Sequence, residues 1–483
     1  MHSSESLQKE IGLVRATKHY LVSIEGLPSA RVHDVVISED GARALVASLR
    51  HDAVEVMMLD TTDVRPGQRF EVSQGSMQLS IGTHLFGRVV NALTDPIDNA
   101  GAFPSKNTPL VLQRDAGDVA HRSAIIEQFF TGYMMTDTVL PIGKGQRQLL
   151  MGPIQSGTDT FCREVIQYQA GHGVICVYVT VGKNPTYIRR LAERLFAGPA
   201  STYTSIIAST SEDSAPLNSI APSVGMQVAE HFCDQGKDVL LVIDDLYTHA
   251  KYLREIGLLE GRLPGRESYP GDIFFQQAHL IERAGSFVGK GSITLLPVLQ
   301  TDIESYTDLI MTNVMGTTDG HLTFSSTQFA QGVFPPIVEE ESVTRVGKHT
   351  QSVVQKQLST SVTALLADAK EQERFVQFGT QVADSSRTMI TMGRILRVLL
   401  DQDETDHLDC EVQSVLLALV FTTFANGKDE SFFRTQRHVL ANAIMNEPVF
   451  THVRELATTA NDLDSFLKEI EKKVAAFAKI CQI

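Results

Sequence analysis

The sequence predicts a multidomain protein with a small N-terminal β-barrel, a central α/β domain and a C-terminal α-helical bundle. Three observations support this fold class. Short apolar runs between turn residues fill the first part of the chain, apolar runs alternate with helical patterns in the middle, and glycine and proline become sparse toward the end. These changes in texture predict domains at residues 1–79, 80–353 and 354–483.

The first region contains closely spaced runs of strand length at residues 21–24, 35–37, 45–49 and 54–59. Turn residues such as Gly41, Pro66 and Gly67 separate these runs or follow them. Many short strands in a small domain are typical of a closed barrel.

The central region carries dense apolar runs at residues 149–151, 174–181 and 239–243. Such runs are expected for parallel strands that are buried on both faces. Patterns with helical spacing occur at residues 161–170, 187–196 and 224–234. The alternation predicts a doubly wound α/β core.

The last region has helical patterns throughout. Phe466, Ile470 and Phe477 belong to an apolar stripe at helical spacing between residues 466 and 480, which predicts packing in a bundle rather than a helix on a membrane surface. The acidic run at 401–406 is expected to be a solvated loop.

Composition and charge exclude several classes of protein. The chain has 483 residues and a formal net charge of −15, which argues against nucleic acid as a partner because phosphate contact needs a basic face. The start of the chain has no signal-peptide pattern, and the longest apolar run, 415–421, is too short to span a bilayer. The five cysteines are scattered without metal-site spacing, so we expect a soluble cytosolic type of chain with reduced, buried thiols and no metal ligands of its own.

A glycine loop follows the apolar run at 149–151 and reads Gly152-Pro-Ile-Gln155-Ser-Gly157-Thr158-Asp159. A functional P-loop would read GxxxxGK[ST], so both glycines have the right spacing while Thr158 replaces the lysine and Asp159 the hydroxyl residue. Two glycines alone fit a chance turn equally well. A second signal therefore matters: the run at 239–243 ends in Asp244, as in a strand whose aspartate positions magnesium-bound water. Together they predict a central domain of the P-loop, nucleotide-binding type.

Several longer motifs carry a resemblance to a known family. In order along the chain, from about Gly12 to Gly379, they are the segments 87–93, 141–147, 264–272, 280–284, 342–347 and 375–379. With the glycine loop and Asp244, these segments resemble the alpha subunit of F-type ATP synthases. The resemblance implies a barrel crown, a P-loop domain and a helical domain. It also implies an alternating hexamer with catalytic beta-like subunits around a gamma-like central stalk.

The same resemblance implies a non-catalytic chain. Catalytic subunits of the family carry a glutamate general base after the strand that follows the P-loop helix, but here that strand ends in Gly182-Lys183-Asn184. Alpha subunits usually have glutamine at the position of Lys183, so this residue departs from both kinds of subunit. ATP or ADP with magnesium is accordingly expected at the partner's site.

The chain's own nucleotide site is expected to bind nucleotide weakly or not at all. One unit-charge contact at ~4 Å and an effective dielectric of ~20 is worth ~4 kcal/mol. Losing the lysine attraction and placing the Asp159 carboxylate near phosphate should weaken magnesium-ATP binding roughly a thousandfold or more. Lys183 is a candidate ion-pair partner for Asp159, which would act as an internal phosphate surrogate. Asp244 is a second candidate partner, and the alternative is that Lys183 points into solvent.

Arg345 and Ser342 lie in the segment Ser342-Val-Thr-Arg345-Val-Gly347. In the resembling family the matching arginine reaches into the neighbouring beta subunit's site and stabilises charge on the transferring phosphoryl group as an arginine finger. The resemblance therefore implies that Arg345 acts in trans and that Ser342 positions its loop. The bland alternative is a surface arginine in a loop.

Two function classes remain open. The leading one is a subunit of a rotary complex at the cytoplasmic face of a membrane, which moves protons, or alternatively sodium, through a membrane sector that this chain meets indirectly. The alternative is a pseudo-ATPase scaffold that is not coupled to ion transport. An active ATPase of the type III secretion kind is disfavoured, because it would need both the P-loop lysine and the glutamate base. Family alpha subunits also carry an N-terminal helical segment that docks the peripheral stalk, and residues 1–10 before the barrel do not match it.

Overall fold

The computed structural model describes residues 10–32, 34–73, 78–103, 108–112, 114, 119–301, 308–377 and 384–482. Residues 1–9, and residues 378 and 379 of the last family motif, lie outside the described residues. Contacts divide the chain into two compact units, which are interleaved along the sequence. The first unit holds Met1–Ser123, Ala170–Thr301 and Ser305–Thr318, and the second holds Ala124–Gln169, Asp302–Glu304 and Asp319–Ile483. The domain boundaries expected after residues 79 and 353 remain a proposal.

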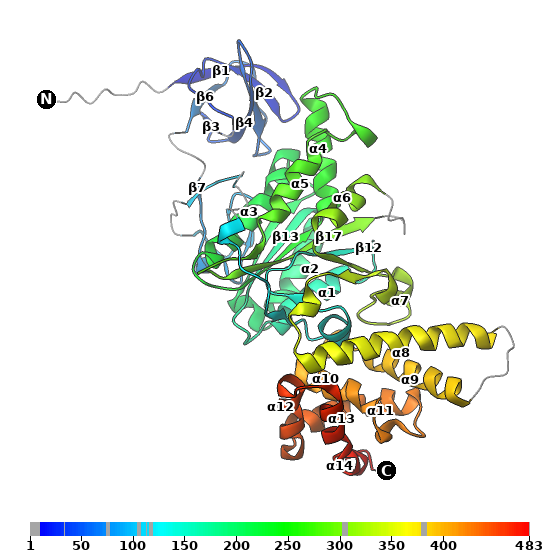
Figure 1. Ribbon diagram of the computed structural model, residues 1–483. Helices are drawn as coiled ribbons and strands as arrows, with labels where there is room; N and C mark the ends of the chain where they lie inside the picture. The colour runs from blue at the N-terminus through cyan, green and yellow to red at the C-terminus, as the bar shows by residue number, and fades with distance from the viewer. Residues whose placement is uncertain are drawn as a thin grey trace. The chain divides into compact units, whose positions relative to one another are not determined.

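The first unit begins with a closed six-stranded barrel, which confirms the predicted N-terminal fold (Figure 1). Its strands pair in the order β1-β2-β5-β4-β3-β6, and buried side chains alternate with less buried ones in β5 and in the first half of β1. Val22, Ile24, Val36, Val56 and Phe70 are among the residues that fill the interior. The strand bounds are Ile11–Lys18, Leu21–Glu25, Val35–Ser38, Arg43–Leu49, Val54–Met58 and Arg69–Val72 for β1 to β6.

The same unit continues with parallel strands in the order β17-β15-β13-β14-β8. The predicted run at 239–243 lies in β15, and the run at 174–181 lies in β13 except for Val174. All of β15 is buried, and β13 is buried except at its ends. Helices α3 and α4 pack on these strands. Their bounds, and those of the other elements here, are β8 Val89–Val90, β13 Ile175–Lys183, α2 Pro185–Phe196, β14 Thr204–Thr210, α3 Ala215–Cys233, β15 Val239–Asp244, α4 Leu246–Leu259, α5 Ile273–Glu282, β17 Ser292–Thr301 and α6 Leu309–Thr317.

The second unit contains the glycine loop and the C-terminal helices. Strand β12 (Gln148–Pro153) pairs in parallel with β18 (Gly320–Thr323), and β18 pairs antiparallel with β19 (Val343–Thr344). Helix α1 (Thr158–Tyr168) follows the loop, and the short helix α7 (Ser326–Ala330) follows β18. The helical region comprises α8 Val353–Gln377, α9 Asp384–Leu400, α10 Cys410–Leu419, α11 Glu430–Asn446, α12 Thr451–Thr459, α13 Leu463–Glu471 and α14 Val474–Ile480.

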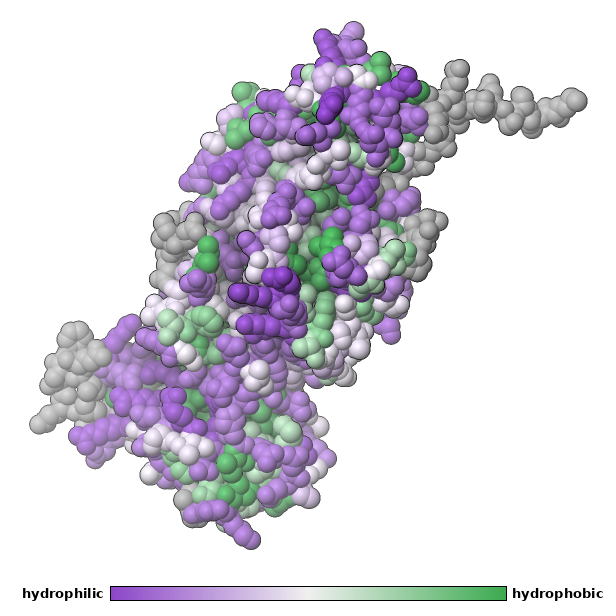
Figure 2. Space-filling model, turned by 180° about the vertical axis from the view of Figure 1, so that it is seen from behind, coloured by the Kyte–Doolittle hydropathy of each residue, from purple (hydrophilic) through white to green (hydrophobic). Residues whose placement is uncertain are grey.

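The predicted stripe at 466–480 proves to be two helices, because a turn at Lys472 and Lys473 separates α13 from α14. Phe466, Ile470 and Phe477 are fully buried, which confirms bundle packing for them. The five cysteines are free and buried, as expected. Among the described residues no helix is long and apolar enough to cross a membrane. Hydrophilic residues predominate on the face drawn in Figure 2, with apolar residues in small scattered groups.

Candidate functional site

The glycine loop keeps a compact backbone that depends on both of its glycines. Gly157 has a φ of 82°, and a Cβ atom there would lie 2.6 Å from the ring of Phe329 on α7. A Cβ atom at Gly152 would lie 2.7 Å from the carbonyl oxygen of Phe324. Neither distance is possible for a real Cβ atom, so the loop can hold only glycine at these positions without rearranging. The backbone path of this loop therefore depends on glycine at both positions.

The residues that replace the lysine and the hydroxyl are accommodated locally. Thr158 is buried, and its hydroxyl lies 2.9 Å from that of Ser156. Asp159 is half-buried in the first turn of α1, where a negative charge is favourable because of the positive end of the helix dipole. Gln155 is exposed and has a φ of 65°. Asp159 can therefore stabilise the start of α1 whether or not its carboxylate also substitutes for a phosphate.

Lys183 and Asp244 form a buried ion pair in the first unit. Lys183 ends β13 and Asp244 ends β15, and these strands are neighbours with Thr180 in register with Asp244. The Lys183 Nζ lies 2.7 Å from Asp244 Oδ1 without the alignment of a hydrogen bond, and it donates a hydrogen bond to Gln300 Oε1 at 2.9 Å. The side chain of Asp244 is 1% exposed and that of Lys183 16%. The partner of Lys183 is therefore the second candidate predicted from the sequence, and the solvent-facing alternative is wrong.

Two tyrosines complete the environment of Asp244. The hydroxyl groups of Tyr178 and Tyr187 donate hydrogen bonds to Asp244 Oδ2 at 3.0 and 3.1 Å. Each carboxylate oxygen of Asp244 therefore has a contact within the protein. Neither tyrosine is marked by a pattern in the sequence, because Tyr178 lies two residues before the register position of Asp244 and Tyr187 lies on the helix that follows β13. A magnesium-bound water would have to compete with these contacts for the carboxylate.

Asp245 adds a second carboxyl group beside Lys183. Its Oδ2 atom lies 3.9 Å from Lys183 Nζ, and its Oδ1 atom accepts a hydrogen bond from Thr248 N as the N-cap of α4. Burial raises the pKa of Asp245 to about 6, while the Lys183 charge opposes this shift. One ammonium group thus faces two buried carboxyl groups at the end of β15.

Arg345 projects from a turn whose base is fixed by Ser342. Ser342 is buried, and its hydroxyl accepts a hydrogen bond from Thr323 N at 2.9 Å and donates one to Val338 O at 2.7 Å. Arg345 is exposed, and its backbone N–H donates to Asp319 O at 3.1 Å. These contacts hold the start of the segment, and the role of Ser342 in positioning Arg345 stays a prediction.

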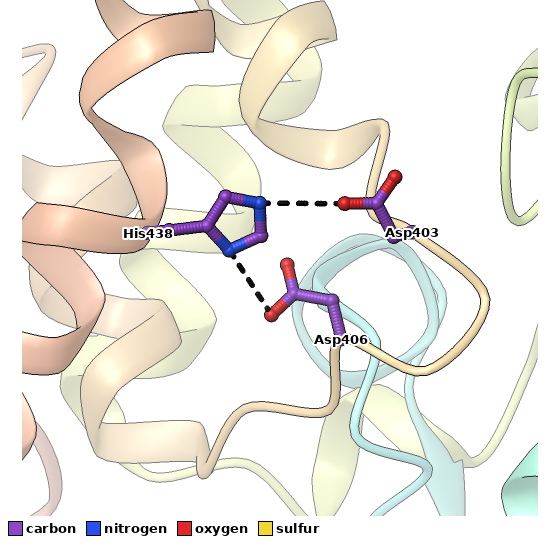
Figure 3. A group of neighbouring side chains, drawn as sticks. All are labelled: Asp403, Asp406 and His438. Atoms are coloured by element: carbon purple, nitrogen blue, oxygen red, sulfur yellow. Dashed lines mark ion pairs between the residues drawn. The ribbon is translucent and has the colours of Figure 1, made fainter.

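A charge cluster in the helical region was not anticipated. His438 Nε2 lies 3.3 Å from Asp403 Oδ2 and His438 Nδ1 lies 3.7 Å from Asp406 Oδ1 (Figure 3). Arg437 Nη2 lies 3.3 Å from Asp403 and 3.1 Å from Asp406. The guanidinium already contacts both carboxylates, so a metal cation would meet positive charge there. The cluster is an ion-pair network that ties α11 to the loop before α10.

This network corrects one expectation. The acidic run at 401–406 is a loop, as predicted, but it is not simply solvated. Gln402 is buried, and the Asp406 side chain is only 15% exposed because it faces Arg437. The sequence pattern failed here because the pairing residues lie more than thirty positions further along the chain.

Comparison with known proteins gives two family matches. Residues 132–344 match the nucleotide-binding domain of the ATP synthase alpha/beta family. Residues 351–477 match the C-terminal domain of the ATP synthase alpha/beta chain.

Curated relatives agree with these matches over nearly the whole chain. The ATP synthase subunit alpha of Acholeplasma laidlawii is 36% identical over 423 residues, which cover 87% of this chain and 83% of the relative. That of Mycoplasmoides gallisepticum is 32% identical over 482 residues, or 99% of this chain and 92% of the relative. That of Dictyoglomus thermophilum is 35% identical over 422 residues, or 86% and 81%.

Proposed function

We propose, from the premise that this chain belongs to the ATP synthase alpha/beta family as an alpha subunit of an F-type complex, that it is a non-catalytic subunit which serves catalysis in a neighbouring subunit. It forms an alternating hexamer with catalytic beta-like subunits around a gamma-like stalk. Arg345 enters the neighbouring site as an arginine finger. The complex sits at the cytoplasmic face of a membrane and couples ATP to proton, or alternatively sodium, transport.

The observation that carries this proposal is the exposed Arg345 on a fixed turn. Arg345 is an exposed residue in a segment whose backbone is held at Asp319 and whose base is held by Ser342. A planar guanidinium suits the charge that spreads over a transferring phosphoryl group, and a finger of this kind contributes about 10³ to 10⁵ in kcat. Ser342 acts through Arg345 and is a positioning residue.

The absence of catalysis on the chain's own loop follows from three residues. Thr158 supplies no positive charge for phosphate, Asp159 supplies a negative one, and β13 ends at Lys183 without a carboxylate to activate water. The Asp244 carboxylate, which would position magnesium-bound water, is engaged by Lys183 and two tyrosine hydroxyls. These residues do not fit a tightly held magnesium nucleotide. The backbone amides at the start of α1 leave room for a weak anion or nucleotide.

The degenerate loop also favours a second candidate function, a pseudo-ATPase scaffold outside ion transport. A scaffold would keep the hexamer contacts but would not need an arginine finger. The effect of Arg345 on ATP hydrolysis therefore distinguishes the two proposals.

The test is co-expression with the beta-like partner and measurement of ATP hydrolysis by the purified hexamer. We expect Arg345→Ala to lower kcat by at least a thousandfold while the hexamer still assembles. Lys348→Met removes another positive charge from the same segment and serves as the control, with kcat expected within about twofold of the unmodified protein. An Arg345→Ala hexamer that turns over normally would support the scaffold instead.

A further inference from the structure

Arg147 and Asp319 form a clamp beside the turn that carries Arg345. Arg147 immediately precedes β12, and Asp319 immediately precedes β18. Arg147 donates to the Asp319 carboxylate from its backbone N at 2.9 Å, from Nε at 2.9 Å and from Nη2 at 2.7 Å. In return, Asp319 N donates to Arg147 O at 2.9 Å. Both carboxylate oxygens of Asp319 are thereby engaged by one arginine.

Asp319 also faces Arg345. Strands β18 and β19 pair antiparallel with Gly320 opposite Thr344, and one position further the N–H of Arg345 donates to the carbonyl of Asp319 at 3.1 Å. Directly opposed residues of an antiparallel pair have Cβ atoms about 4.5–5.5 Å apart. An aspartate at this position lies within reach of the long side chain of Arg345 and is its natural partner for a competing ion pair.

From this geometry we infer that Arg147 is a positioning residue, which holds the Asp319 carboxylate and so prevents it from capturing the guanidinium of Arg345. The inference rests on the proposed function, because it assigns Arg147 to the delivery of the finger. The segment that leads into the glycine loop would then contribute to catalysis in the neighbouring subunit, because Arg147, immediately before β12, forms the ion pair with Asp319.

The chemistry of the clamp supports this role. A bidentate arginine-carboxylate pair is stronger and more directional than a contact with a single point charge. The side chains of Arg147 and Asp319 are 23% and 16% exposed, so solvent screens the pair only in part. Removing Arg147 would leave a half-buried carboxylate opposite an arginine, and the two would pair.

Capture of Arg345 by Asp319 and a merely structural clamp differ in the activity expected of a double variant. In the hexamer with its beta-like partner, Arg147→Met should lower kcat about tenfold with little change in the KM for magnesium-ATP, because the finger acts on the transition state. Asp319→Asn should stay within about twofold of the unmodified protein, because an amide carries no charge to capture Arg345. The double variant Arg147→Met/Asp319→Asn should regain activity to about the level of Asp319→Asn.

Three outcomes are decisive. Recovery in the double variant supports capture. If Arg345→Ala lowers kcat but the double variant is no faster than Arg147→Met, the clamp is only structural and the inference is overturned while the proposed function stands. If Arg345→Ala leaves kcat unchanged, both fail. Assembly of every variant is checked by size-exclusion chromatography, and Arg147→Gln, which can still donate one N–H to Asp319, repeats the comparison if Arg147→Met does not assemble.

Discussion

The Nζ atom of Lys183 lies 2.7 Å from Oδ1 of Asp244, and this ion pair places an internal cation at the aspartate that ends β15. Alpha subunits of the resembling family usually have glutamine where Lys183 stands. The family's magnesium-bound water needs an accepting carboxylate at the strand end, and here an ammonium group competes for it. The substitutions at Thr158 and Asp159 therefore do not stand alone. Like those two substitutions, Lys183 disfavours the binding of a magnesium nucleotide.

The first prediction concerns the stability that this pair provides. Lys183→Met leaves Asp244 buried without its cation and should cost about 3 kcal/mol, because breaking one half of a buried pair strands the other charge. Lys183→Met/Asp244→Asn should cost less than the sum of the single variants, because both charges of the pair are removed and only Asp245 is left without the lysine. The measurement is equilibrium denaturation of the isolated chain followed by circular dichroism, which suits a protein without tryptophan.

A matched control for this prediction is Lys472→Met. Lys472 pairs with Glu469 on the surface with its side chain 66% exposed, and such pairs contribute about 0 to 1 kcal/mol. If Lys183→Met destabilises the chain no more than Lys472→Met, the pair with Asp244 contributes nothing beyond a surface contact.

The second prediction concerns nucleotide affinity. Thr158→Lys/Asp159→Thr restores the pattern GxxxxGK[ST] and should tighten magnesium-ATP binding by the isolated chain roughly a thousandfold. Both loop glycines are retained, so the amide cradle needs no change. Isothermal titration calorimetry measures the gain, and Thr158→Ala/Asp159→Ala, which removes the repulsion without adding a lysine, should gain less. Tight magnesium-ATP binding by the unmodified chain would contradict the assignment of a weakened site.

The sequence predicted the regular elements well because their signals are local. The apolar runs at 149–151 and 239–243 lie within strands, as does the run at 174–181 except for its first residue, since strands buried on both faces need continuous apolar residues. The division of the C-terminal stripe at Lys472 and Lys473 was not predicted, because a turn of two residues leaves the spacing of the apolar residues nearly helical.

The site was predictable only as far as its motifs reached. Lys183 and Asp244 were both named from the sequence, but the choice of Asp244 as partner depends on the register of β13 with β15. Tyr178, Tyr187 and Gln300 surround the pair from three separate positions, and no local pattern marks them. Contacts between residues that are distant in the sequence can be identified only from the three-dimensional structure, whereas a motif shows only which residue types are present.

The third prediction concerns acid stability and His249. Burial lowers the pKa of His249 to about 4 from 6.5, and its Nε2 atom lies 3.0 Å from Ser219 O. A depressed folded-state pKa means that the unfolded chain binds the proton first as the pH falls. The contribution of neutral His249 to stability is therefore complete above about pH 6.5 and is lost progressively toward pH 4, by about 3 kcal/mol in all.

His249→Gln removes this titration while keeping an N–H donor for Ser219 O. The difference in unfolding free energy between pH 7 and pH 4 should shrink by about 3 kcal/mol relative to the unmodified chain. His51→Gln, at an exposed position of the barrel, is the control and should leave the difference unchanged. An unaltered slope in His249→Gln would mean that this histidine does not titrate abnormally.

The last prediction separates the charge of the finger from its shape. Arg345→Lys keeps a positive charge on the turn but replaces a planar fork of five N–H donors by a single ammonium group. If the guanidinium acts on phosphoryl oxygens, the lysine variant should lose nearly as much kcat as Arg345→Ala, at least a hundredfold, with a small change in KM. Steady-state hydrolysis by the assembled hexamer measures both constants. Recovery to within about tenfold of the unmodified protein would show that charge alone suffices and that Arg345 acts at a distance.

Ser342→Ala tests the positioning of the loop in the same assay. It removes the contacts to Thr323 N and Val338 O and leaves the arginine unchanged, so it should lower kcat only about tenfold.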